Sequence, residues 1–320
     1  MYEFIDVIEF FIGIANNLKK GAVNLHTPLE EMVLKACRGD LAYIDNRRDA
    51  KGKYGYDFWG DLDSSWLTNQ GIEERLLYSK SEQFPDFIFK VRRCESKLVC
   101  GSLLELKDSK GGSVASFNST LPTKYKSLEE IDVINGNNLV SRFASVIDGK
   151  LSLAENYYTL QRKCFYLIRT HKDDNRVKLS LVDGSFFETV PKEHLIYQMF
   201  LNILRAHLEK KDLKILPETL KQVEEVLSQV TDQTIIAASQ IIERASVRPR
   251  LRIMAEVHSE GNPHSSFYPE ISEGSFNLIL HAFAYDEKAA KLISQRIPEV
   301  KMLTIHHKRN GEHIVFQFKL

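Results

Sequence analysis

The sequence predicts an α/β fold in which a mixed central β-sheet is flanked by helices. Two observations lead to this fold class. Segments with the apolar spacing of helices and segments with the apolar–polar alternation of strands follow each other along the chain, and no internal repeat or low-complexity tract is present. The expected helices are residues 1–20, 27–37, 71–80, 191–245 and 286–296. The expected strands are two within 84–107, then 164–169, 177–182, 250–258, 276–283 and a terminal hairpin around Asn310-Gly311.

Local signals at the ends of the elements support these assignments. Thr27 and Pro28 supply an N-cap and a first helical residue for the second helix. Leu216-Pro217 interrupts the long helical region, because proline cannot donate the backbone hydrogen bond that a helix interior needs. Asp183-Gly184 and Asn310-Gly311 are dipeptides typical of tight turns.

Length and composition restrict the classes of protein to consider. The 320 residues are enough for one large domain or two modest ones, and Lys plus Arg equals Asp plus Glu at 43 each. A chain without net charge that binds nucleic acid must gather its basic residues locally. No apolar run reaches the roughly 18 residues of a membrane helix, so no membrane partner is expected. Four scattered cysteines without a CxxC pair favour free thiols and a cytoplasmic location.

The most informative pattern is Pro85-Asp86, followed after eighteen residues by Glu105-Leu106-Lys107. Residues directly opposite each other in a hairpin have numbers symmetric about the turn. Asp86 and Glu105 are symmetric about the Glu95–Ser96 bond, which lies in a polar stretch. A regular hairpin therefore places both carboxylates opposite each other, and Lys107 shares their face. Apolar residues of both strands point the other way into a core, namely Phe87, Phe89, Val91, Leu104 and Leu106.

This grouping suits a hard divalent cation beside a phosphate. Two adjacent carboxylates repel each other unless a cation lies between them, and Mg²⁺ takes carboxylate oxygens while keeping waters and binding substrate phosphate. Asp86, Glu105 and the backbone carbonyl of Leu106 are the expected metal ligands. Lys107 is then placed to orient or deprotonate an attacking water, or to stabilise developing phosphoryl charge.

The tripeptide alone has little specificity. Glu-x-Lys also begins at residues 95, 209 and 299, and Asp-x-Lys at 49, 148, 212 and 286. The alternative interpretation is that Asp86 ends a strand while Glu105 and Lys107 form a solvated set of surface charges. The apolar strand and the hairpin register favour the metal site.

Pro85-Asp86 with Glu105-Leu106-Lys107 resembles the PD-(D/E)xK nuclease superfamily, above all its type II restriction endonucleases. The segment 116–122 is also similar to segments of such enzymes. The resemblance implies a restriction-endonuclease-like core at residues 65–200, Mg²⁺-dependent hydrolysis of DNA phosphodiesters and a homodimer on a palindromic site. It also implies a glutamate from a helix before the hairpin, for which Glu73 or Glu74 is the candidate and Glu30 or Glu31 a weaker one. Residues 1–64 then form a helical and loop region and 201–320 an extension for recognition or dimerisation, unless all form one domain.

Polar and basic segments are candidates for DNA contacts, since phosphate and base-edge contacts need such side chains. They are Ser116, Asn118, Ser119, Thr120 and Lys124; Arg248, Arg250 and Arg252; and His258, Asn262 and His264. Each has a structural alternative: a capped loop, ion pairs with Glu243 and Glu256, and a solvent loop. Three functions follow: a site-specific restriction endonuclease, a related nuclease of repair, recombination or transposition, and a non-catalytic DNA-binding protein.

Overall fold

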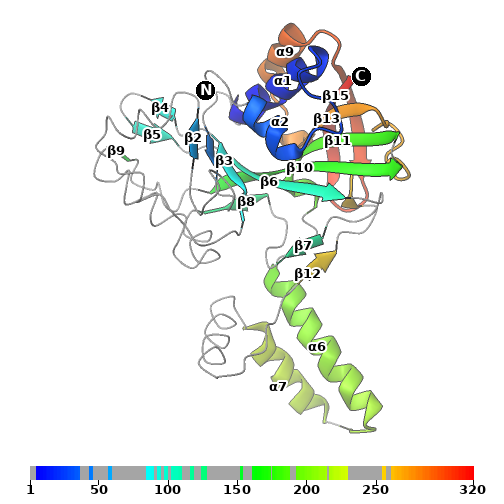
Figure 1. The fold of residues 1–320 in the computed structure, drawn as a ribbon. Coiled ribbons are helices and arrows are strands. Elements are labelled where there is room, and N and C mark those ends of the chain that lie inside the picture. The colour runs from blue at the N-terminus through cyan, green and yellow to red at the C-terminus, as the bar shows by residue number, and fades with distance from the viewer. Residues whose placement is uncertain are drawn as a thin grey trace, which may run out of the picture. The chain divides into compact units, whose positions relative to one another are not determined.

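The computed structural model describes two compact units, residues 1–187 with 255–320, and residues 188–254 (Figure 1). The described residues are 5–36, 43–45, 57–59, 84–89, 92–94, 97–99, 102–109, 116–118, 124–127, 152–153, 161–173, 175–187, 192–214, 216–229, 254–256 and 261–320. The expected helix 71–80 lies outside them. These units do not coincide with the expected regions 1–64, 65–200 and 201–320. The first helices pack into the core of the larger unit, and the last strands belong to its sheet.

The larger unit is organised around a mixed sheet of 10 strands in the described part of the chain. Nine follow the order β14-β15-β13-β11-β10-β6-β3-β1-β2, and β8 pairs with β10. They are β1 (Tyr43–Asp45), β2 (Asp57–Trp59), β3 (Phe87–Phe89), β6 (Leu103–Ser109), β8 (Tyr125–Lys126), β10 (Arg162–Asp173), β11 (Arg176–Asp183), β13 (Ser275–His281), β14 (Lys301–His307) and β15 (Gly311–Lys319). The pairs β6–β10 and β11–β13 are parallel and the others antiparallel, which confirms the mixed α/β class.

Two smaller sheets accompany it. The strands β4 (Arg92–Cys94), β5 (Lys97–Val99) and β9 (Ser152–Leu153) form one, and β7 (Ser116–Asn118) pairs with β12 (Met254–Glu256) in the other. The strand expected at 250–258 is therefore described at its centre only.

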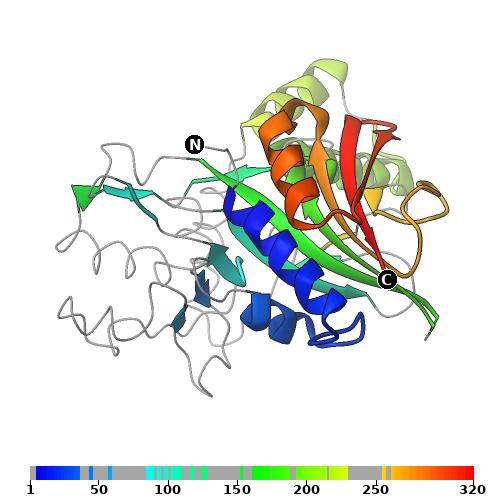
Figure 2. The same ribbon diagram turned by 90° about the horizontal axis from the view of Figure 1, so that it is seen from above.

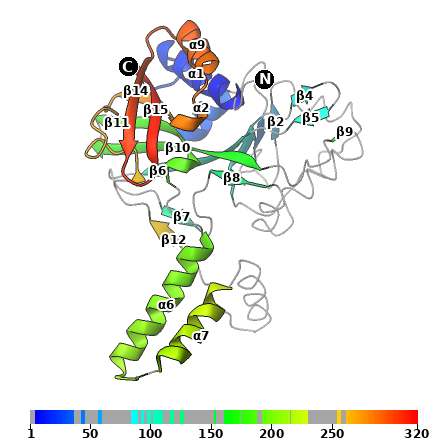
Figure 3. The same cartoon turned by 180° about the vertical axis from the view of Figure 1, so that it is seen from behind.

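Three helices cover one face of the large sheet, namely α1 (Ile5–Lys19), α2 (Leu29–Ala36) and α9 (Glu287–Arg296). From above, α1 and α9 lie side by side across the strands (Figure 2), and the view from behind shows the same layering (Figure 3). Phe10 and Phe11 of α1 are fully buried against this face, and the Phe11 ring lies 4.8 Å from that of Phe276 in β13. The apolar face of α1 and the apolar face of the sheet thus pack together in one core.

Several element ends match the local signals in the sequence. The second helix begins at Leu29, directly after Pro28, and the helix expected at 286–296 is α9, whose N-cap Asp286 accepts a hydrogen bond from the Lys288 amide. Asp183 caps a 3₁₀ turn, η4 (Gly184–Phe186), by accepting from the Ser185 amide. The terminal hairpin joins β14 to β15, and Gly311 has a φ of 77°, a conformation that glycine adopts without strain.

The smaller unit contains two described helices, α6 (Lys192–Lys210) and α7 (Pro217–Ser228). The interruption predicted at Leu216-Pro217 is observed: Leu216 is the N-cap of α7 and Pro217 its first residue. Arg205 of α6 donates to Glu224 of α7 at 2.6 Å, which links the two helices. Among the described residues, no helix is long and apolar enough to cross a membrane.

Two histidines pack against Phe186, and a third histidine packs against one of them. The Phe186 ring lies 4.9 Å from His307 and 5.1 Å from His313, and His281 lies 4.9 Å from His313. The pKa of His313 is lowered to about 4, chiefly by burial; a hydrogen bond with the Gly311 carbonyl opposes this shift, and electrostatic interactions with His281 and His307 add to it. The surroundings of His313 therefore favour its neutral form.

We expect the protein to lose stability between pH 7 and pH 5. The folded pKa of about 4 lies below the ordinary 6.5, so the stabilisation is present above pH 6.5 and is lost as the pH falls toward 4. A shift of this size predicts a free energy of unfolding about 2 kcal/mol lower at pH 5 than at pH 7. Urea unfolding of wild type, His313→Phe and the exposed control His306→Gln measures it. An equally steep pH dependence in His313→Phe contradicts the assignment.

Candidate active site

The hairpin that carries Asp86 and Glu105 has the register that the sequence predicts. Strand β3 pairs with β6 through Phe87–Leu104 and Ile88–Leu103. Strands β4 and β5 pair with the same symmetry, from Arg92–Val99 to Cys94–Lys97. Both ladders are symmetric about the Glu95–Ser96 bond. The paired residues end at Phe87–Leu104, and the same register extended by one position would set Asp86 opposite Glu105.

Burial separates the two faces of this hairpin. Phe87 and Leu104 are fully buried in the core beneath the helices, and Leu106 packs against that core. Because side chains alternate along a strand, Glu105 and Lys107 point to the opposite face. Their side chains are only 14% and 20% exposed. The interpretation as a solvated set of surface charges does not fit this burial.

Hydrogen bonds fix the positions of the three motif side chains. The Leu106 amide donates to Asp86 Oδ2 at 2.7 Å, which ties Asp86 to the centre of the motif. Lys107 Nζ donates to Glu105 Oε1 at 2.6 Å. The second oxygen of Glu105, Oε2, is buried and accepts no hydrogen bond from the described residues. A buried carboxylate oxygen without a donor is costly unless a cation or a proton compensates it.

Burial raises the pKa of Glu105 above its ordinary value. The charge and hydrogen bond of Lys107 and the backbone amide of Asp86 lower that pKa, but burial outweighs them. The carboxyl thus lies in surroundings that disfavour its charge, and a nearby positive ion would reverse this preference.

The donor set fits a hard divalent cation. Glu105 Oε2 has no hydrogen-bond donor among the residues that the structure describes, and the Asp86 carboxylate lies beside the Leu106 amide, from which it accepts a hydrogen bond. In an extended strand the N–H and C=O of one residue face the same neighbour. Since the Leu106 amide faces Asp86, its carbonyl faces the same side. Within the described ranges no group of three or more His, Cys, Asp or Glu side chains is placed to hold a metal; Asp86 and Glu105 supply two carboxylates.

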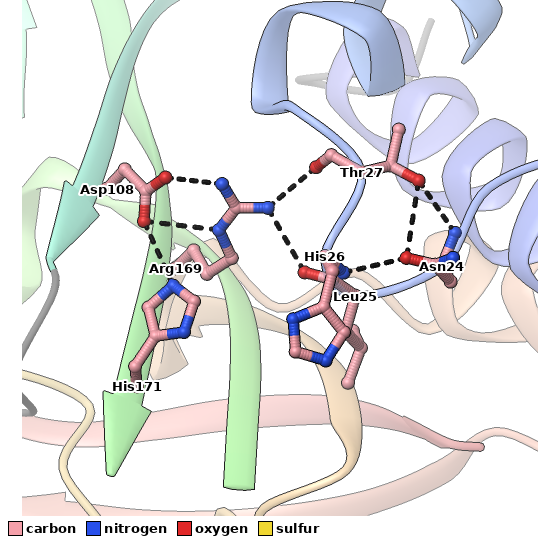
Figure 4. A network of polar contacts seen from close by, with 7 residues as sticks. All are labelled: Asn24, Leu25, His26, Thr27, Asp108, Arg169 and His171. Carbon is pink, nitrogen blue, oxygen red and sulfur yellow. Dashed lines mark hydrogen bonds and ion pairs between the residues drawn. The ribbon is translucent and has the colours of Figure 1, made fainter. Parts of the chain in front are cut away.

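An ion-pair network holds the end of β6 next to this site (Figure 4). Asp108, adjacent to Lys107 but on the helix-covered face, accepts from Arg169 Nε at 3.1 Å and also from Nη2. Arg169 Nη1 donates to the carbonyls of Leu25 at 3.1 Å and Thr27 at 2.6 Å, in the loop between α1 and α2. Burial would raise the pKa of Asp108, but Arg169 and His171 together lower it. The network anchors the strand that carries Glu105 and Lys107.

The candidate glutamates that precede the hairpin lie in different parts of the chain. Glu73 and Glu74 lie outside the described residues. Glu30 and Glu31 are exposed on α2, which packs on the face opposite Glu105, and Glu31 pairs with Lys35. The structure therefore does not bring α2 to the carboxylate pair.

The candidate DNA contacts fall in several places. Outside the described residues lie Ser119, Thr120, Arg248, Arg250, Arg252 and His258. Ser116 and Asn118 belong to β7, and Lys124 is exposed just before β8. Asn262 is buried, and His264 Nδ1 accepts from the Ser266 amide inside a compact loop. This loop packs onto the sheet, because Lys178 Nζ and Gln317 Nε2 donate to the carbonyls of Ile271 and Glu270.

Sequence reasoning missed the basic residues that begin β10. Arg162 and Lys163 pair with β8, and the structure thereby brings them beside Lys124 and Lys126. The signal in the sequence was the dibasic pair directly before the apolar strand 164–168.

Comparison with known proteins gives no match: no protein-family model, no curated protein and no solved structure is similar to this chain.

Proposed function

We propose that this protein is a Mg²⁺-dependent endonuclease that cuts double-stranded DNA at a specific site, as a restriction enzyme does. One observation carries the proposal: Asp86 accepts a hydrogen bond from the Leu106 amide next to Glu105, whose buried second oxygen has no hydrogen-bond donor among the described residues and whose first oxygen binds Lys107. These are the residues by which the chain resembles the PD-(D/E)xK pattern.

Asp86, Glu105 and the Leu106 carbonyl are the residues that would hold the ion. A divalent cation there supplies a bound water of lowered pKa and neutralises charge on the phosphate under attack. The Leu106 amide orients the Asp86 carboxylate, and Lys107 keeps the Glu105 side chain in one position. Burial restricts water around these groups, which strengthens their electrostatic effect on a bound phosphodiester.

Lys107 has two roles available from its position. Its ammonium group lies on the same face of β6 as the Glu105 carboxylate and donates to it at 2.6 Å. An ammonium group beside a reacting phosphate stabilises the charge that develops on the phosphoryl oxygens. It also hydrogen-bonds and orients a water molecule that attacks phosphorus. Both roles make Lys107 a catalytic residue rather than a structural one.

Cleavage of both strands of a palindromic duplex needs two active sites. A homodimer with twofold symmetry provides them, because each subunit then faces one strand of the symmetric sequence. The proposal therefore includes a homodimer, with duplex DNA as substrate and Mg²⁺ as cofactor.

Incubation of the purified protein with phage DNA tests the proposed activity. With Mg²⁺ we expect discrete fragments, and with excess EDTA intact DNA, because the carboxylate pair cannot act without its cation. Discrete fragments support a site-specific enzyme, whereas a smear or a preference for branched DNA supports a repair or recombination nuclease of the same superfamily. Absence of cleavage with Mg²⁺ or Mn²⁺, in protein shown by circular dichroism to be folded, contradicts both and leaves DNA binding without catalysis.

A further inference from the structure

Strand β14 (Lys301–His307) forms an edge of the large sheet in the described part of the chain. It is first in the order of the strands and pairs with β15 alone among them (Figure 3). On its other side, no described residue forms a hydrogen bond with the backbone of residues 301–306. In an antiparallel ladder, alternate residues point both the N–H and the C=O group away from the partner strand. The β14 edge therefore offers directional donors and acceptors to a further strand.

This edge lacks the features by which edge strands usually avoid further pairing. Such features are a very short strand, an internal proline, a β-bulge or several charged side chains. β14 has seven residues, no proline and one lysine, which is its first residue. All seven residues pair with β15 without a shift of register. By contrast β2, at the other end of the described strand order, has three residues. β14 is therefore long and regular enough to accept another strand.

The side chains of β14 leave this edge accessible. Thr304 and His306 are exposed, and the large apolar side chain of Met302 is 55% exposed. Alternation puts Met302 on the same face as Thr304, and the half-buried Leu303 on the opposite face. A second strand along the edge would cover apolar surface on both faces in addition to pairing the backbone groups. Removal of that surface from water stabilises such a pair.

The symmetry of the strand favours a second copy of this chain as the partner. When a twofold axis runs perpendicular to the sheet between two antiparallel edge strands, each side chain stays on its own face. Residues opposite each other share a face, so their numbers differ by an even amount. Only an axis at Thr304 obeys this rule and pairs all seven residues of β14. The resulting pairs are Lys301 with His307, Met302 with His306, Leu303 with Ile305, and Thr304 with its own copy.

Charge and side-chain type agree with this register. Like charges directly opposite each other destabilise an antiparallel pair, and here Lys301 lies opposite a histidine instead of its own copy. Leu303 and Ile305 form apolar pairs across the two strands, and Thr304 forms a threonine pair; both kinds of pair stabilise a sheet. An axis moved to Leu303 or to Ile305 would leave two residues of each strand unpaired. The axis at Thr304 therefore matches the most residues.

We propose that two copies of this chain associate through antiparallel pairing of their β14 strands, with a twofold axis at Thr304. The large sheets of the two copies then continue into each other, with about six backbone hydrogen bonds between the subunits. The inference goes beyond the proposed function, which calls for two subunits without naming the surface that joins them. Because seven residues make a small interface, the dimer forms in a concentration-dependent way in the micromolar range.

Charge substitution at the axis tests this interface, because only a residue on a twofold axis faces its own copy. Sedimentation velocity over a micromolar concentration series, without DNA or metal, measures the dimer dissociation constant. We expect Thr304→Lys and Thr304→Glu each to raise this constant at least about tenfold, since like charges then meet across the axis. An equimolar mixture of the two variants should recover the dimer, since lysine then faces glutamate. The matched control is Ser294→Lys, at an exposed hydroxyl residue on α9.

Amide hydrogen exchange of the wild-type protein locates the interface without any substitution. We expect slower exchange within residues 301–307 at high protein concentration than after dilution, because pairing protects the outward N–H groups. Equal exchange at both concentrations in a protein that dimerises contradicts the β14 interface and places the contact elsewhere.

The remaining outcomes separate this inference from the proposed function. Weakened dimers in both variants, with recovery in the mixture, support the interface even in a protein that never cleaves DNA, which would contradict only the proposed nuclease. A wild-type protein that stays monomeric overturns the inference, as does a dimer that both folded variants form as readily as wild type. Weakened dimers without recovery in the mixture contradict an axis at Thr304. DNA cleavage is measured separately and decides none of these outcomes.

Discussion

Replacement of Glu105 by glutamine is expected to lower the single-turnover rate of duplex cleavage by about 10²- to 10⁴-fold while duplex binding is retained. Glutamine keeps the shape of the side chain and can still accept from Lys107, but it carries no charge for a cation. Lys107→Ala should show a loss of similar size, because it removes the ammonium group that binds the Glu105 carboxylate. Cleavage at saturating Mg²⁺ and binding in Ca²⁺ measure the two properties separately.

Asp86→Asn refines this test. The asparagine oxygen can still accept from the Leu106 amide, so the local hydrogen bond survives while the negative charge is lost. We expect folded protein with cleavage reduced to a similar degree. Glu312→Gln, on the exposed start of β15, is the control that changes a glutamate outside the site. Normal cleavage by Glu105→Gln or Lys107→Ala shows that the site is assigned to the wrong residues.

Replacement of Arg169 by alanine is expected to lower the free energy of unfolding by about 3–5 kcal/mol. Arg169 is buried, and its guanidinium group serves Asp108 and two backbone carbonyls at once. Its removal leaves these acceptors without their donors, and the loop between α1 and α2 loses its attachment to the sheet. Urea unfolding followed by circular dichroism measures the change.

Arg169→Lys and Arg176→Ala are the informative comparisons. Lysine keeps the charge but cannot reproduce the planar group of donors, so we expect Arg169→Lys to recover only part of the stability. Arg176 pairs with Asp173 at the exposed turn after β10, where solvent screens the interaction, and Arg176→Ala should change stability little. A small effect of Arg169→Ala would mean that the loop is held by apolar packing instead.

Local sequence patterns determine much of the hairpin that carries the candidate site. Alternation assigns Leu104 and Leu106 to the core and Glu105 and Lys107 to the other face, and this separation is observed. The symmetry about the polar turn sets the register of β3 with β6, in which Phe87 lies opposite Leu104. Both inferences succeed because strand periodicity and hairpin register depend on residues close together in the chain.

Long-range packing decides what local patterns leave open. Arg169 reaches the carbonyls of Leu25 and Thr27 across more than a hundred residues, and the pairing of β10 with β8 places Arg162 opposite Lys126. Likewise, the burial of Asn262 follows from the docking of its loop on the sheet.

The sequence by itself thus determined the α/β class, most element positions in the described ranges, the register of β3 with β6 and the shared face of Glu105 and Lys107. Only the tertiary structure decided that the Glu105 and Lys107 side chains are largely buried, that Glu105 Oε2 has no donor in the described part of the chain, and that Arg162 lies opposite Lys126. The physical reason is that burial and electrostatic surroundings are sums over residues distant in sequence, whereas periodicity and register are local.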